Sequence, residues 1–149
     1  MFRGWIISIV VVGIYISIKL IIGTIRNPAS AVNNKPDRIQ SFATGMPQLA
    51  VLKAIVRYAQ TSIYKIEIFD ENNGNLVLSD AASLTSYGFF YPIFVRSRGT
   101  GTLVEVGIKS RSWQVGPIVT RHHDRCFNWM KAAILAGSTK CEPSDARQS

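Results

Sequence analysis

The chain has 149 residues, a formal net charge of +8 and two cysteines. That length excludes two full domains but leaves room for one membrane anchor and one domain of roughly 100 residues, which can bury a core without metal or disulfide staples. Cys126 and Cys141 form no CxxC pair, so we expect two free thiols in a reducing compartment and a bridge only in an oxidising one.

The first predicted element is a transmembrane helix. Thirteen of the twenty-one residues from Trp5 to Ile25 are Ile, Val or Leu, and Lys19 is the one charge. About 20 helical residues at about 1.5 Å each span a bilayer core of about 30 Å. We therefore predict an anchor over residues 1–26, in which Trp5, Tyr15 and Lys19 contact the membrane. A signal peptide cleaved after Ala29-Ser30-Ala31 is the alternative.

The positive charges near this segment predict its orientation. Arg26, Lys35 and Arg38 outnumber Arg3 and the amino terminus on the other side, and positive flanks stay in the cytoplasm. We expect a single-pass membrane localisation with a cytoplasmic C-terminal domain. Residues 27–46 are polar and contain proline and asparagine, which predicts a linker.

A helix and a hairpin follow the linker. Apolar residues recur at helical spacing after Pro47, with Lys53 and Arg57 on the other side, which predicts an amphipathic helix. Apolar and polar residues then alternate from 64 to 78 around Asn73-Gly74, a pair typical of hairpin turns because it tolerates positive φ.

A second hairpin is predicted next, with strands over 89–98 and 103–111 around a turn at 99–102. The register that buries the apolar side chains of both strands on one face places Arg96 opposite Glu105, as an opposite-charge pair.

The last predicted element is a helix from Thr120 to about residue 136, with Gly137 as its stop and a disordered tail over 138–149. The whole pattern predicts an α+β fold. An N-terminal single transmembrane helix precedes a two-layer domain over 47–137, in which two helices cover a four-stranded antiparallel sheet in the order α-β-β-β-β-α.

Several turn and strand segments together resemble a family of small bacterial α+β domains of unknown function, over roughly residues 48–136. They are Asn73-Gly74, Gly88-Phe89, Gly101 to Val106 and Lys109 to Arg111. The resemblance implies a fold and no established activity. A fainter similarity, carried by the long helix after antiparallel strands, is to helix-grip ligand-binding folds, for whose cavity four strands are too few.

Residues that could carry chemistry are sparse. His122 and Cys126 lie one helical turn apart, a spacing that can chelate zinc, but a zinc site needs at least three protein ligands. Ser110 and Ser112 lie near the histidines without a Gly-x-Ser-x-Gly elbow, and the loop at 99–101 does not open a helix as phosphate-binding loops do. We predict a non-enzymatic protein with no catalytic residue, no metal and no cofactor.

Partner binding is assigned to a basic and aromatic face of the second hairpin. It consists of Arg96, Arg98, Lys109, Arg111, Phe94 and Trp113. This face suits an acidic partner or anionic lipid headgroups, whereas nucleic acid is not expected because no binding motif is present. An ordinary solvated sheet face is the alternative interpretation.

These features favour an accessory or assembly subunit of a membrane protein complex, held in the lipid bilayer by its single helix. The alternative hypothesis is a membrane-tethered lipid or small-ligand binding module. That module would need a cavity between sheet and helices, lined by residues such as Val106, Ile108, Phe127 and Met130.

Overall fold

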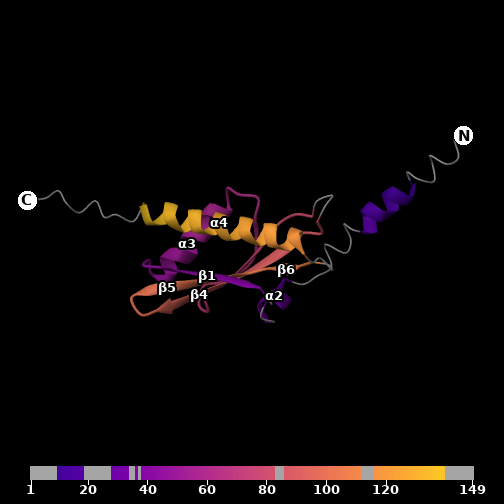
Figure 1. Cartoon of the computed structure of the whole chain (residues 1–149). Coiled ribbons are helices and arrows are strands. Elements are labelled where there is room, and N and C mark those ends of the chain that lie inside the picture. Colours follow the sequence, from indigo (N-terminus) through magenta and orange to yellow (C-terminus); the bar gives the residue numbers. More distant parts are fainter. Residues whose placement is uncertain are drawn as a thin grey trace, which may run out of the picture.

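The computed structural model describes residues 10–18, 28–33, 36, 38–82, 86–111 and 116–139. Residues 10–18 are helical. The elements that follow are α2 (Ala29–Asn33), β1 (Ile39–Thr44), α3 (Gln48–Ala59), β2 (Lys65–Asp70), β3 (Asn75–Ser79), β4 (Phe89–Arg98), β5 (Gly101–Gly107), β6 (Lys109–Ser110) and α4 (Pro117–Thr139). Figure 1 shows α3 and α4 on one side of the sheet and α2 on the other.

The predicted transmembrane helix is wrong. Within the expected anchor the structure describes residues 10–18, and these are helical. Among all the described residues, none of the helices combines the length and the hydropathy needed to cross a membrane. The single-pass membrane localisation loses its support with it. Tyr15 lies in this helical segment and is 58% exposed, while Trp5 and Lys19 lie outside the described residues.

The main core lies between one face of the sheet and the two helices α3 and α4. Its fully buried side chains include Val51, Ile55, Leu76, Leu78, Phe89, Tyr91, Ile93, Val95, Val104, Val106 and Met130. Each large side chain of this kind contributes about 1.5–3 kcal/mol when it is removed from water. The predicted α+β class is therefore confirmed, with the apolar sheet face covered by helices.

The sheet has six strands within the described residues, so the predicted number of four is wrong. Its order is β1-β5-β4-β3-β2, and β6 pairs with the start of β4. β1 lies in the predicted linker 27–46 and pairs with β5 over its whole length, from Ile39 with Gly107 to Thr44 with Thr102. Its two large apolar residues, at 39 and 42, are three residues apart, and this spacing hides the strand period of two.

The register of β4 and β5 differs from the predicted one by two residues. Glu105 pairs with Phe94, while Arg96 stands opposite Leu103. The turn is shorter than predicted and begins at Gly99, whose φ of +58° suits the first central position of a two-residue hairpin turn. A shift of two residues keeps every side chain on its own face, so the predicted buried set is retained.

The predicted turn at Asn73-Gly74 is confirmed and has further support. Gly74 has a φ of +62°. The Asp70 carboxylate accepts hydrogen bonds from the backbone N–H of Asn73 at 3.1 Å and from its side-chain amide at 2.7 Å. The Arg96 guanidinium donates to the Asn73 carbonyl and, at 2.7 Å, to the side-chain oxygen of Asn75. Arg96 is thus a structural residue of this turn.

α4 is longer than predicted at both ends. It begins at Pro117 and continues past Gly137 to Thr139. A Cβ atom on Gly137 would lie 2.7 Å from the Cβ of Ala54 in α3, closer than real Cβ atoms approach one another. Gly137 therefore permits the close approach of α3 and α4, and its predicted role as a helix stop is wrong.

A smaller core lies on the other face of the sheet. Ala31 of α2 packs there with Val77 and Phe90, and Val32 and Ile68 border the group. This contact positions α2 on the face opposite to α3 and α4 (Figure 1).

Candidate functional site

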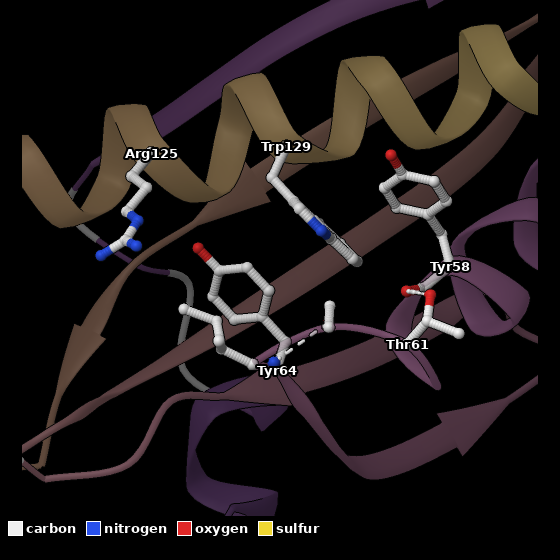
Figure 2. Close-up of a pocket in the computed structure, with 7 residues that line it drawn as sticks. Tyr58, Thr61, Tyr64, Arg125 and Trp129 are labelled. Atoms are coloured by element: carbon white, nitrogen blue, oxygen red, sulfur yellow. Dashed lines mark hydrogen bonds between the residues drawn. The ribbon is translucent and has the colours of Figure 1, made fainter.

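A pocket of about 390 Å³ opens between the end of α3, the loop that follows it and the middle of α4. It is lined by Tyr58, Thr61, Ser62, Ile63, Tyr64, Arg125 and Trp129. We call it the Arg125 pocket. Figure 2 shows Arg125, Tyr64, Trp129 and Tyr58 following one another along α4.

Three aromatic rings form the wall of the Arg125 pocket. The ring of Trp129 lies 4.8 Å from that of Tyr64 and 5.6 Å from that of Tyr58, with interplanar angles of 57° and 49°. These tilted contacts fall in the favourable range for aromatic pairs. Tyr64 is buried, whereas Tyr58 is 39% exposed and Ile63 is 63% exposed. The rings therefore run from the core to the solvent.

The loop between α3 and β2 is held by its own hydroxyl groups. Ser62 donates a hydrogen bond to the carbonyl of Ala59 at 3.0 Å and accepts one from the backbone N–H of Tyr64 at 3.1 Å. Thr61 donates to the carbonyl of Tyr58 at 3.3 Å. These bonds fix the direction in which the chain leaves α3, and so they place Tyr64 against Trp129.

Arg125 supplies the charge of the pocket. It is exposed and lies one helical turn before Trp129, so both side chains leave the same flank of α4. Among the described residues it has no hydrogen-bonding or ion-pairing partner. Its guanidinium carries a positive charge and has five N–H donors. The pocket therefore combines apolar ring surface with an available positive charge.

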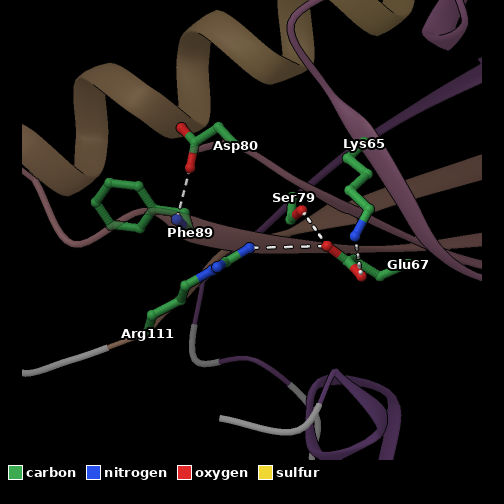
Figure 3. Close-up of polar contacts among 6 residues, drawn as sticks. All are labelled: Lys65, Glu67, Ser79, Asp80, Phe89 and Arg111. Atoms are coloured by element: carbon green, nitrogen blue, oxygen red, sulfur yellow. Dashed lines mark hydrogen bonds and ion pairs between the residues drawn. The ribbon is translucent and has the colours of Figure 1, made fainter. Parts of the chain in front are cut away.

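A buried polar cluster lies behind the pocket. Tyr64 packs edge-on against Tyr91 at 5.6 Å, and the Tyr91 hydroxyl donates to the Asp80 carboxylate at 2.9 Å. The same carboxylate accepts from the backbone N–H of Phe89 at 2.6 Å and contacts Nδ1 of His122 at 3.1 Å. Figure 3 shows the bond from Phe89. Asp80 thus connects β4 with α4 from the end of β3.

Burial keeps three groups of this cluster protonated. It raises the pKa of Tyr64 and of Tyr91, and the nearby Asp80 adds to both shifts. Burial also raises the pKa of the Cys126 thiol, although a hydrogen bond with Tyr64 opposes the shift. A neutral, fully buried thiol is a poor nucleophile, because the thiolate is the reactive form.

The histidines named from the sequence have structural partners. His122 contacts Asp80 and packs its ring 4.7 Å from that of Phe89. His123 is buried and its Nε2–H donates to the carbonyl of Val106 at 2.8 Å. Within the described part of the chain, no three His, Cys, Asp or Glu side chains are grouped so that they could hold a metal ion.

The structure does not gather the predicted basic and aromatic face into one patch. Lys109 pairs with Phe90, eight residues along β4 from Arg98, which corresponds to about 26 Å. Arg111 lies with its guanidinium 4.5 Å from the ring of Phe90 and 3.9 Å from Glu67 (Figure 3).

At the far end of β4, Arg96 is engaged in the β2–β3 turn and lies 5.6 Å from the ring of Phe94. Arg98 is exposed beside the β4–β5 turn, and Trp113 lies outside the described residues.

The residues expected from the sequence to line a ligand cavity are instead packed in the main core. The expected lining residues Val106, Ile108, Phe127 and Met130 all belong to the main core and are at most 9% exposed. Sequence reasoning missed the Arg125 pocket because two segments about 60 residues apart in the sequence form it, residues 58–64 and the middle of α4. The sequence feature that could have indicated the pocket is the spacing of four residues between Arg125 and Trp129, which places both side chains on one flank of a helix.

Comparisons with known proteins show similarity in fold. The chain matches no protein-family model and no curated protein sequence. The crystal structure of Ara h 8.0201, which has a Bet v 1-like fold, matches with a TM-score of 0.52 and 10% identity, over 68% of this chain and 99% of that chain. A DUF4468 family protein from Bacteroides ovatus matches with a TM-score of only 0.30 and 14% identity, over 74% and 89% of the two chains. The protein is thus an α+β domain whose fold is similar to that of Ara h 8.0201.

Proposed function

We propose that the protein is a non-enzymatic binding domain that holds a small planar anion in the Arg125 pocket. The observation that carries this proposal is a guanidinium without an ion-pair partner among the described residues, beside the rings of Tyr64 and Trp129. The proposal keeps the small-ligand alternative from the sequence but moves it to another site and omits the membrane tether. Membership of the small bacterial family of unknown function is part of the same proposal.

Both halves of the ligand would find a matching surface. An aromatic ring can pack on Trp129 and Tyr58, where such contacts contribute about 0.5–1.5 kcal/mol beyond simple burial. A carboxylate can accept two parallel hydrogen bonds from Arg125, which is the strong geometry for this pair. The pocket volume of about 390 Å³ lies within the range of small-molecule sites.

The chemistry of the neighbouring groups favours binding over catalysis. Cys126 is fully buried and its pKa is raised, so it is not an activated nucleophile. Asp80 and His122 contact each other and tie the end of β3 to α4. These groups are already engaged in holding the fold together.

A matched pair of probes tests the proposal. 2-Naphthoate and 2-naphthamide have the same ring system, and only the first is an anion. We expect the full chain to bind naphthoate at least about tenfold more tightly, because a charge-assisted hydrogen bond contributes about 1.5–3 kcal/mol. Isothermal titration calorimetry measures both dissociation constants.

Three variants assign the binding to this pocket. Arg125→Gln should remove the preference for the anion and leave naphthamide binding unchanged, whereas Trp129→Ala should weaken both ligands. Arg121→Gln, an exposed arginine one turn earlier on α4, is the control and should change neither. The proposal is wrong if naphthoate does not bind, or if Arg125→Gln retains the preference.

A further inference from the structure

β1 and β2 are the two edge strands of the sheet, and they differ in how well they are protected from pairing with a strand of another chain. β2 carries Lys65, Glu67 and Asp70 and has a bulge between Ile66 and Ile68. Charged side chains and bulges are the usual devices that stop an edge strand from pairing with another chain. β2 is therefore a protected edge.

β1 has none of these devices. Its six residues, Ile39–Thr44, include no charge and no proline, and its pairing with β5 is regular from end to end. Ser41 and Ala43 are exposed. Such a strand presents a row of backbone N–H and C=O groups that can pair with a further strand.

We propose that β1 pairs antiparallel with β1 of a second copy of this chain, about a twofold axis near Phe42. Antiparallel pairing keeps both faces of the joined sheets consistent only when residues of equal parity stand opposite each other. An axis at Phe42 meets this condition: it places Phe42 opposite itself, Gln40 opposite Thr44 and Ser41 opposite Ala43. The strand has no charge, so no like charges meet in this arrangement.

The flank of α4 above β1 is complementary to itself. Phe127 packs edge-on against Phe42 at 5.5 Å, Asp124 accepts a hydrogen bond from Gln40 at 2.7 Å, and the Lys131 ammonium lies 5.8 Å from the Phe42 ring. Asp124 precedes Phe127 by three residues and Lys131 follows it by four. A twofold axis near Phe127 therefore brings Asp124 of each chain opposite Lys131 of the other, and this reciprocal charge match favours a second copy as the occupant.

The dimer leaves the Arg125 pocket open. Asp124 and Lys131 lie on the flank of α4 that faces β1, and Arg125 with Trp129 leaves the helix on the opposite flank. Pairing of β1 and ligand binding therefore use separate surfaces.

Sedimentation velocity of the full chain tests this inference. We expect a reversible monomer–dimer equilibrium. The double variant Ser41→Lys/Ala43→Lys places two pairs of like charges across the joint and should raise the dissociation constant about tenfold. Ser41→Lys/Ala43→Glu changes the same two exposed positions but makes the pairs opposite in charge, so it should dimerise at least as tightly as the wild type. Thr100→Lys, in the exposed β4–β5 turn, is the control and should have no effect.

Charge exchange on α4 provides the second measurement. Asp124→Lys and Lys131→Asp should each weaken self-association, and a mixture of the two variants should form a heterodimer in which both pairs are restored. A chain that stays monomeric at every concentration overturns the inference, including the case in which β1 instead accepts an extended peptide from another protein. Equal dissociation constants for the two Ser41/Ala43 double variants, or no recovery in the mixture, also overturn it.

Discussion

Removal of the Asp80 carboxylate should be one of the most destabilising single changes in the domain. Asp80 is 8% exposed and accepts hydrogen bonds from the backbone N–H of Phe89 and the hydroxyl of Tyr91, both on residues that are fully buried. Asp80→Ala leaves two buried donors without an acceptor, and each such group costs about 1–3 kcal/mol. The variant no longer bears the cost of burying a carboxylate, which offsets part of this, so we expect a net loss of about 3 kcal/mol in the free energy of unfolding.

Asp80→Asn separates the acceptor role from the charge. The amide oxygen can still accept from Phe89, and the Tyr91 hydroxyl can rotate to accept from the amide nitrogen, so the loss should be about 1 kcal/mol. Urea unfolding followed by circular dichroism measures both variants, with the exposed Glu71→Ala as the control for loss of a carboxylate. Surface substitutions usually change the free energy of unfolding by at most about 0.5 kcal/mol. A change no larger than this for Asp80→Ala would refute the argument.

Three further outcomes follow from the packing and the titrating groups. Gly137→Leu should cost about 1–3 kcal/mol by overpacking against α3, and adding Ala54→Gly should recover part of that loss in the same urea assay. Burial raises the pKa of Cys126 and of Tyr64, so the folded state holds these protons more tightly than the unfolded state. These two groups should contribute fully to the free energy of unfolding below about pH 8. Their contribution should fall as the pH rises through the pKa values of about 8.5 for Cys and 10 for Tyr in the unfolded state. In urea unfolding, Cys126→Ala should remove the part of the fall in the midpoint that begins near about pH 8.5. Arg96→Ala should lower stability by about 1 kcal/mol, and Arg96→Lys should not restore it, because a single ammonium cannot reach both acceptors in the β2–β3 turn.

The buried faces could be predicted from the sequence because they depend on periodicity alone. β4 and β5 alternate with a period of two, and the apolar residues of α3 recur at helical spacing, so the core side of each element was readable. The register of β4 and β5 could not be predicted in this way, because two registers that differ by two residues bury the same faces. The structure has the one in which Arg96 stands opposite Leu103 and not opposite Glu105. The hydrogen bonds of Arg96 to the β2–β3 turn come from tertiary structure.

The errors at the two ends of the domain have a different cause. β1 has weak apolar alternation and becomes a strand through its pairing with β5, a contact more than 55 residues away along the chain. Gly137 is a residue type that commonly ends helices, but here it lies inside α4, where the absence of a side chain allows close packing against Ala54. The Arg125 pocket likewise depends on side chains from α3, its following loop and α4. Local patterns carry no information about such contacts.

Tyr64 connects the wall of the Arg125 pocket with the main core. One side of its ring faces Trp129 in the pocket, and its other contacts, with Tyr91 and Cys126, belong to the core. The wall of the pocket is therefore continuous with the main core, so the ligand binding proposed above would need little ordering of the wall, which lowers its entropic cost. Arg125 adds charge to this rigid wall from the exposed flank of α4, while the core fixes the helix beneath it.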